Sequence, residues 1–249
     1  MCLIAFDWQP HQQDWLTLVA NRDEFYHRET RALHLWDANF YAGKDLLAGG
    51  SWLGVDKSAR FAALTNIRAP GQGPQSPLSR GHLITRYLEQ DISPEHFVQQ
   101  VSSTAADYGL FNLIVGDRRA VYYCHNHPDF YAQRLNPGIF GLSNAHLNTP
   151  WPKTELAKDK LKLWQKARRT PLTSLLDSRD IVNDEQLPQT GIPLEWERAL
   201  SSQFILTPDY GTRSSTSLLG RGKHLAIEEI SWGKNGEASA KHTYSIEID

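Results

Sequence analysis

Cysteine is scarce in this sequence: Cys2 and Cys124 are the only two among 249 residues. Two cysteines do not make the disulfide framework of a small secreted domain. Long apolar runs are missing as well. Residues 3–6 are shorter than the apolar core of a signal peptide, and no segment reaches the length of a membrane span. We therefore expect a cytoplasmic protein without stable insertion in a membrane.

A large charge of either sign is also missing. The sequence carries 26 basic and 28 acidic residues, so its formal net charge is −2, and it contains no basic stripe. This balance argues against nucleic acid as a partner. Neither common glycine-rich phosphate loop is present, which argues against a nucleotide-dependent enzyme. The length and a composition of 40% apolar and 22% charged residues favour one globular domain over residues 1–249.

What is present begins with Cys2, directly behind Met1. A small side chain at this position generally lets the initiator methionine be removed, which would give Cys2 a free α-amine. The α-amine titrates at about 7.7–8.0 and a free thiol at about 8.5, so the amine can accept the thiol proton near neutral pH. This is the terminal-amine form of an activated nucleophile. The alternative is that Cys2 is only a small buried apolar residue.

The apolar pattern predicts hairpins alternating with helices rather than βαβ units. Strands are predicted at 2–6, 15–20, 49–55, 61–66, 111–116, 120–124, 138–144, 204–206, 209–217, 225–232 and 243–248. Helices are predicted from Ser79, from Pro94 and over about 153–168, with shorter pieces near 172–178 and 194–201. Residues 25–45 show no clear period and are interpreted as a loop or as short pieces of regular structure. This order is typical of antiparallel sheets with helices packed outside them.

Polar residues follow several of the predicted strands. Asn21-Arg22-Asp23-Glu24 comes directly after the strand at 15–20, and Asn66 and Asn144 end two later strands. Four consecutive side chains that carry charge or hydrogen bonds at a strand end suggest a site. The alternative is a solvated turn with internal salt bridges.

Five stretches of the chain match one known family in order: Cys2, Asn21-Arg22-Asp23-Glu24, Gly50-Ser51-Trp52-Leu53-Gly54-Val55, Thr65-Asn66 and Thr212-Arg213-Ser214-Ser215-Thr216. On these residues the chain resembles the NRDE family, also called the transport and Golgi organization protein 2 family. That family in turn is similar to the N-terminal-nucleophile hydrolases of the penicillin V acylase and bile-salt hydrolase type. The resemblance implies an α+β fold, a four-layer αββα sandwich of antiparallel sheets.

The same resemblance implies a set of site residues. In those hydrolases the mature chain starts with a cysteine, and an arginine and an aspartate near the end of the second strand contact it. Arg22 and Asp23 are the counterparts here. The hydrolases separate the two, whereas here they are adjacent, which leaves open that one points elsewhere with Asn21 or Glu24 in its place.

Three later residues complete the implied site. Asn66 matches the asparagine that helps to bind the oxyanion in those hydrolases. Asn144 approximates a second asparagine and Arg213 a late arginine, and these two matches are looser. Amide donors suit an oxyanion, a carboxylate suits a terminal ammonium, and an arginine can lower a thiol pKa or bind a substrate carboxylate.

The first functional hypothesis is a hydrolase or acyltransferase that acts on an amide or thioester of a small amphipathic substrate through an acyl intermediate on Cys2. The second is a carrier with the same pocket, because the family is implicated in haem trafficking and in acyl-lipid homeostasis. No cofactor is required by either hypothesis, and haem would be cargo. The oligomeric state is left open.

A metal site is a third, weaker possibility. Cys124, His125 and His127 lie within four residues, with His146 further along the chain. Zinc needs three or four ligands, and a single His-x-His pair at the end of a strand is usually exposed surface. The sequence therefore predicts no metal.

Overall fold

The computed structural model describes residues 2–74 and 77–248, and its strands form two antiparallel sheets. Sheet A has six strands in the order β10-β1-β2-β11-β12-β13, and sheet B has seven in the order β3-β4-β5-β6-β7-β8-β9. The strands of sheet A are β1 (Cys2–Trp8), β2 (Asp14–Phe25), β10 (Gly138–Leu142), β11 (Tyr210–Arg221), β12 (His224–Trp232) and β13 (Ala238–Glu247). Those of sheet B are β3 (Thr30–Leu35), β4 (Phe40–Asp45), β5 (Leu53–Asp56), β6 (Phe61–Asn66), β7 (Phe111–Gly116), β8 (Val121–His125) and β9 (Tyr131–Arg134).

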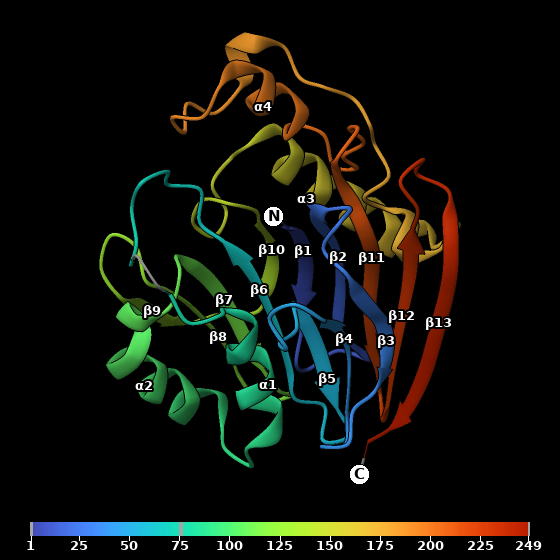
Figure 1. Ribbon diagram of the computed structural model, residues 1–249. Coiled ribbons are helices and arrows are strands. Elements are labelled where there is room, and N and C mark those ends of the chain that lie inside the picture. The colour runs from blue at the N-terminus through green and yellow to red at the C-terminus, as the bar shows by residue number, and fades with distance from the viewer. Residues whose placement is uncertain (1, 75–76, 249) are drawn as a thin grey trace.

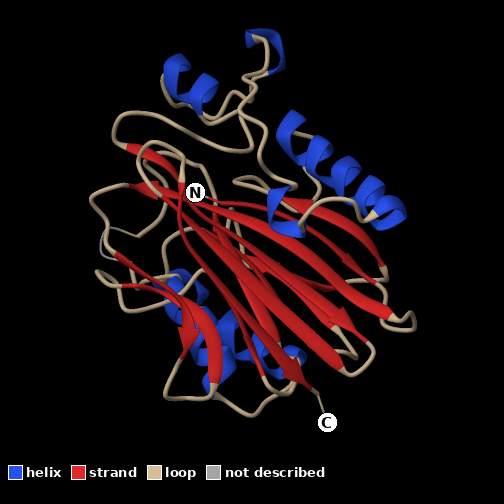
Figure 2. Cartoon of the chain, turned by 90° about the vertical axis from the view of Figure 1, so that its right-hand side faces the viewer, coloured by secondary structure: helices blue, strands red, loops and turns tan. Residues whose placement is uncertain are grey.

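Helices cover the outer face of each sheet (Figures 1 and 2). Helices α1 (Gly81–Glu89) and α2 (Pro94–Thr104) pack on sheet B, and α3 (Pro152–Ala167) packs on sheet A. The short helix α4 (Leu194–Ala199) lies beyond one end of the sheets. The fold is thus the predicted four-layer αββα sandwich. No helix in the described part of the chain has the length and apolar character needed to cross a membrane.

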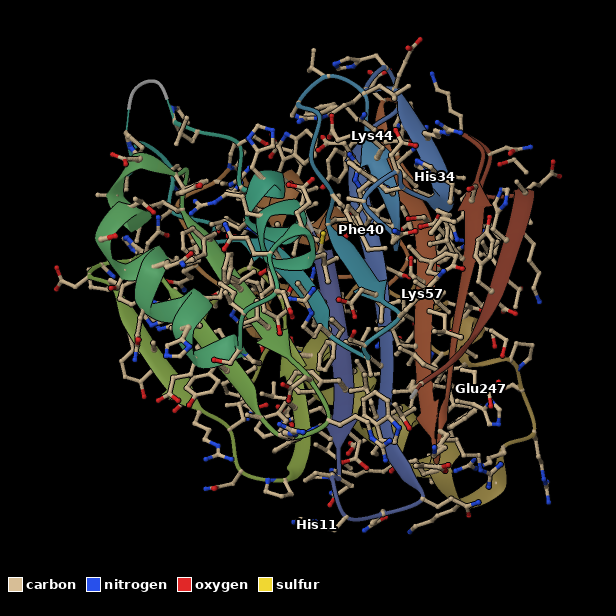
Figure 3. The ribbon with its side chains drawn as sticks, turned by 90° about the horizontal axis from the view of Figure 1, so that it is seen from below. His11, His34, Phe40, Lys44, Lys57 and Glu247 are labelled. Carbon is tan, nitrogen blue, oxygen red and sulfur yellow. The ribbon has the colours of Figure 1, made fainter. Side chains whose placement is uncertain are left out.

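Period-2 alternation divides the strands of sheet A between two cores. On β1, Ile4 and Phe6 point into the core between the sheets, whereas Leu3 and Ala5 pack against α3. Cys2 shares the face of Ile4 and therefore points toward sheet B. Figure 3 looks along the molecule from below, where side chains fill the space between the layers.

The helix starts agree with their sequence signals. Ser93 caps α2 by accepting a hydrogen bond from the His96 backbone N–H at 3.2 Å. Pro94 occupies the first turn of that helix. Pro152 begins α3 in the same way. The predicted helix near 172–178 is only a 3₁₀ turn, Leu172–Ser174.

Of the two alternatives for residues 25–45, the loop is wrong and short pieces of regular structure are present. Strand β2 continues through Phe25, and β3 and β4 follow it as a hairpin. Strand β3 is an edge strand with only Leu33 fully buried, and its register shifts between Arg31 and His34, so the sequence shows no clean alternation. It follows that the segment 21–24 lies inside β2 rather than at its end.

Two further strand assignments also differ from the prediction. The run 204–206 forms only an isolated bridge, between Leu206 and Gly211. Strand β9 was not predicted because it is an exposed edge strand of four residues with no buried face. In the first case Phe204 and Ile205 are buried, so the run is apolar without pairing as a strand. In the second, burial imposes little pattern on an exposed edge strand.

A buried carboxyl group joins the two sheets at β3. Glu229 of β12 is 1% exposed and accepts hydrogen bonds from the Leu33 backbone N–H at 2.7 Å and from Thr216 Oγ1 at 3.1 Å. Burial raises the pKa of Glu229 to about 7. The folded protein therefore favours the protonated form of this side chain.

This linkage predicts a pH-dependent contribution to stability. Protonated Glu229 stabilises the folded state. This stabilisation is fully present below the pKa of about 4.3 that the side chain has in the unfolded chain, and it is lost as the pH rises to about 7. The free energy of unfolding of the wild type minus that of Glu229→Gln should therefore fall between about pH 4.5 and 7. Denaturant titrations at several pH values measure this difference. Glu247→Gln, at an exposed position of β13, is the control, and an equal slope in both variants would contradict the assignment.

Candidate active site around Cys2

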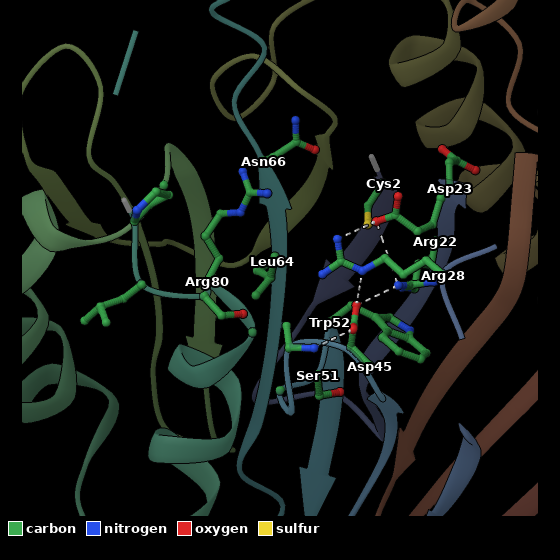
Figure 4. Close-up of a pocket in the computed structure, with 18 residues that line it drawn as sticks. Cys2, Arg22, Asp23, Arg28, Asp45, Ser51, Trp52, Leu64, Asn66 and Arg80 are labelled. Carbon is green, nitrogen blue, oxygen red and sulfur yellow. Dashed lines mark hydrogen bonds and ion pairs between the residues drawn. The ribbon is translucent and has the colours of Figure 1, made fainter. Parts of the chain in front are cut away.

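A cavity of about 290 Å³ opens beside Cys2 at one end of the sandwich (Figure 4). It is formed by the start of β1, the second half of β2, the ends of β4 and β6, and the segment that leads into α1. Four of the six predicted site residues line it: Cys2, Arg22, Asp23 and Asn66. Residues distant in sequence thus meet at one end of two facing sheets.

Alternation along β2 places Arg22 and Asp23 on opposite faces of sheet A. Arg22 is the register partner of Cys2, on the face that continues from the inter-sheet core residue Ala20. Asp23 is 1% exposed and accepts a hydrogen bond from Thr212 Oγ1 at 2.7 Å. Burial raises the pKa of Asp23 above its ordinary value, and Lys153 and this hydrogen bond oppose the rise. The two adjacent residues therefore flank the Cys2 backbone from different sides.

Asn21 and Glu24, the two alternatives, differ in their position. Asn21 Nδ2 donates hydrogen bonds to the carbonyls of Leu176 at 2.8 Å and Gln203 at 2.9 Å, so it fixes the chain that follows α3. Glu24 lines the cavity, and its Oε2 lies 3.9 Å from Arg22 Nη2. Only Glu24 is positioned to take part in cavity chemistry.

The Arg22 guanidinium is held between an aromatic ring and a carboxylate. It lies 4.5 Å from the centroid of the Trp52 ring, and its Nη2 donates to Asp45 Oδ2 at 3.0 Å. Asp45 also accepts from Arg28 Nε at 2.7 Å and from the Ala48 backbone N–H at 3.0 Å. Burial by itself would raise the pKa of Asp45, but these donors hold it below the ordinary value. Asp45 is therefore an ionised anchor for both arginines.

The Cys2 thiol is largely buried, since the residue is 8% exposed, and burial raises its pKa above the ordinary value. The negative charge of Asp23 raises it further, and the positive charge of Arg22 lowers it. Arg22 thus lowers the thiol pKa, but by less than burial raises it. A thiol in this environment needs a base within reach to become a nucleophile.

Asn144 lies next to Asn66 rather than on the cavity wall. Its Nδ2 donates to Asn66 Oδ1 at 3.1 Å and to the Asn66 backbone carbonyl at 3.0 Å. Asn66 Oδ1 is occupied by this hydrogen bond. The Asn66 side chain therefore has its Nδ2 as the group that can donate a hydrogen bond in the cavity. Ser143, the residue before Asn144, donates from its Oγ to the Cys2 carbonyl at 3.3 Å.

Arg213 is not brought to the cavity. It is the extra residue of a β-bulge in β11, where Thr212 pairs with Asp23 and Ser214 with Arg22. The bulge turns Arg213 out of the alternation, and its Nη1 donates to the carbonyl of Phe25 at 3.1 Å and to those of Tyr26 and Arg28 at 3.2 Å. Arg213 therefore closes the turn between β2 and β3 instead of contacting the thiol.

Two cationic residues near the site were missed by the sequence reasoning. Lys153, in the first turn of α3, is 4% exposed, and its Nζ donates to the Leu200 carbonyl at 2.8 Å. Burial lowers the pKa of Lys153 to about 8 against the opposing charge of Asp23. Arg80, just before α1, lines the cavity. In the sequence, both resemble the solvated charges found at ordinary helix starts, so no pattern identifies them.

The histidines considered for a metal site lie elsewhere. His125 and His146 stack with ring centroids 4.2 Å apart, and burial together with His146 and His127 lowers the pKa of His125 to about 4. Within residues 2–74 and 77–248, no group of three or more histidine, cysteine, aspartate or glutamate side chains is placed to hold a metal ion.

The Asp45 anchor generates a stability prediction. Asp45→Ala leaves the Arg22 guanidinium buried without its closest carboxylate, which should lower the free energy of unfolding by about 3 kcal/mol. Asp37→Ala, at an exposed position before β4, should change it by less than about 0.5 kcal/mol. Urea titrations of both variants test this. A loss for Asp45→Ala no larger than that for Asp37→Ala would show that the ion pair contributes little.

The chain is similar in sequence to a family of known proteins. The family model described as Transport and Golgi organisation 2 matches residues 1–230. The Transport and Golgi organization protein 2 homolog of Bos taurus is 36% identical over 244 residues, and that of Homo sapiens is 34% identical over 246; each alignment covers 88% of both chains.

A solved structure, the Caenorhabditis elegans N-acylethanolamine-hydrolyzing acid amidase ortholog, superposes with a TM-score of 0.51 at 13% identity. The superposition covers 89% of this chain and 93% of that one. At this identity the likeness extends to the fold, which is that of the N-terminal-nucleophile hydrolases. The match over most of the chain, with the identities to its relatives, shows that the chain belongs to the Transport and Golgi organisation 2 family.

Proposed function

We propose that the protein is a hydrolase that cleaves an amide or thioester of a small amphipathic substrate through an acyl intermediate on Cys2. The observation that carries this proposal is the meeting of the Cys2 thiol, Arg22, Asp23 and Asn66 at one cavity. The fold shared with an amidase supports it. The proposal requires removal of Met1, which lies outside the described residues.

The chemistry proceeds in two steps. The Cys2 α-amine accepts the thiol proton, and the sulfur attacks the carbonyl carbon to give a tetrahedral oxyanion. The C–N or C–S bond then breaks, and the ammonium returns its proton to the leaving amine or thiolate. In the second step the oxygen of a water molecule attacks the carbonyl carbon of the thioester, and the α-amine accepts a proton from that water. The S–C bond breaks, the acid departs, and the thiol is restored.

Each neighbouring residue has a physical role in these steps. Asn66 Nδ2 donates to the oxyanion, and Asn144 holds the Asn66 side chain in place through its 3.1 Å contact. Asp23 stabilises the ammonium form of the α-amine from the opposite face of β2. Arg22 offsets part of the effect that burial has on the thiol pKa. Arg213 acts only through the turn that it closes.

A carrier that holds the same ligand without cleaving it is the second candidate. The observation in its favour is that burial raises the pKa of the Cys2 thiol, which disfavours the thiolate that attack on a carbonyl requires. Haem or an acyl lipid would be the cargo. Such a protein would show saturable binding but no acyl intermediate.

Acylation of Cys2 is the first test. Intact-mass measurement of purified protein should show a chain that begins at Cys2, and incubation with p-nitrophenyl butyrate should add one butyryl group to that residue. Cys2→Ala should remain unmodified. Cys124→Ala is the matched control and should be acylated like the wild type, because Cys124 is buried and burial raises its pKa. Retention of Met1 would rule out the terminal-amine mechanism.

The role of Asn66 gives a second test. Asn66→Ala should reduce the rate constant for acylation by p-nitrophenyl butyrate about 10²–10³-fold, since it removes one oxyanion donor. The rate constant of the nitrophenolate burst phase, measured at one fixed substrate concentration for both variants, reports this rate. Asn136→Ala, at an exposed position between β9 and β10, should leave the rate unchanged. Loss of acylation together with a lowered unfolding midpoint would point to a structural role for Asn66 instead.

A further inference from the structure

A second hollow continues outward from the Cys2 cavity. This outer groove has a volume of about 480 Å³ and shares four lining residues with the cavity, Glu24, Arg28, Asn66 and Arg80. Its remaining wall is mostly apolar and consists of Phe25, Arg68, Ile192, Pro193, Trp196, Leu200 and Tyr210. A ligand whose reacting carbonyl lies at Cys2 would therefore contact charged side chains near that carbonyl and apolar side chains further out along the groove.

Most of the arginines along this path are already paired with carboxylates. Arg22 and Arg28 contact Asp45 at 3.0 and 2.7 Å. Arg68 contacts Glu197 of α4 at 2.7 Å. Glu24 also lies 3.9 Å from Arg22 and 3.8 Å from Arg28. Three carboxylates thus balance the charges of these three arginines.

Arg80 differs from these three. Its Nη1 donates to the Leu110 carbonyl at 3.1 Å, and within residues 2–74 and 77–248 its guanidinium forms no ion pair within 4.0 Å. A guanidinium has five N–H donors in a planar fork, which matches a carboxylate in two parallel hydrogen bonds. Figure 4 shows the Arg80 side chain extending toward Asn66, at the junction of the two hollows.

Partial burial of the Arg80 guanidinium strengthens its attraction for an anion. Arg80 is half-buried, and burial lowers the pKa of its guanidinium, opposed by the nearby Cys2 and Glu24. A cation that has lost part of its hydration and has no carboxylate partner gains more from an incoming anion than a solvated surface arginine does. The junction is thus suited to a negatively charged group.

We propose that Arg80 is a specificity-determining residue that binds a carboxylate of the substrate at this junction, while the apolar part of the same substrate lies in the outer groove. This inference rests on the proposed function, because it places the scissile carbonyl at Cys2 and Asn66. The substrate class is an amphipathic amide or thioester that carries a carboxylate within a few bonds of its reacting carbonyl. Trp196 and Phe25 contact the apolar portion.

Binding without turnover tests this inference. Calorimetric titration of Cys2→Ala with N-decanoylglycine, and with its neutral amide N-decanoylglycinamide, compares two ligands that differ only in the carboxylate. The carboxylate should bind roughly tenfold or more tightly, as expected for hydrogen bonds between charged groups. Adding Arg80→Gln should abolish this preference, whereas Arg80→Lys should keep part of it as a point charge.

Two further variants separate charge from apolar contact. Trp196→Ala should weaken both ligands by a similar factor, because it removes groove surface and no charge. Arg119→Gln, at an exposed position remote from both hollows, should keep the full preference.

Equal affinity for the two ligands, an unchanged preference in the Arg80→Gln background, or no binding of either ligand would overturn the proposal. The outcome is independent of catalysis, because the assay uses a chain without the Cys2 thiol. A failure of Cys2 acylation with p-nitrophenyl butyrate would instead count against the proposed hydrolase. The Arg80→Lys variant keeps the test decisive if Arg80→Gln does not fold.

Discussion

The buried Arg22 guanidinium is the constraint on which the site depends. It comes from sheet A, and the carboxylate that neutralises it, Asp45, comes from the end of β4 in sheet B. A charge at 5% exposure cannot remain there without a partner, so this ion pair ties the two sheets together beside the Cys2 thiol. Trp52 completes the enclosure by stacking on the guanidinium at 4.5 Å. The position of the Cys2 thiol follows, because Cys2 is the register partner of Arg22.

Strand alternation then determines what each neighbour can do. Cys2, Arg22 and Glu24 face the space between the sheets, and Asp23 faces the side of α3, where buried Lys153 lies. The bulge at Arg213 lets Thr212 and Ser214 pair with Asp23 and Arg22 on either side of the extra residue. One tetrapeptide in a strand thus supplies groups to both sides of the same cysteine.

The electrostatic layout of the two hollows favours an amphipathic ligand. Near Cys2 the wall is polar and its charges are largely paired, whereas the outer groove is apolar up to α4. The Arg68–Glu197 ion pair fixes α4 to the segment that follows β6, so the groove has a defined wall. Arg80, at the junction of the two hollows, takes no part in the ion pairs of Arg22, Arg28 and Arg68, so we propose it as the cation that binds a ligand. The amphipathic substrate that we propose would meet a matching environment along its whole length, unlike a uniformly polar or uniformly apolar molecule.

From the sequence, the alternation of apolar residues predicted antiparallel sheets with helices outside them, because strand faces leave a period-2 pattern. The resemblance of five short stretches to one family implied the rest: the four-layer fold and the residues Cys2, Arg22, Asp23 and Asn66 that line the cavity. Only the tertiary structure decided that Arg213 closes a turn, that Asn144 orients Asn66, that β3 and β4 pair as a hairpin at the edge of sheet B, and that Lys153 and Arg80 approach the site. These features depend on a register shift in a distant strand pair and on which charges lose their solvent when layers pack. Neither leaves a periodic trace in the chain, so packing alone fixes them.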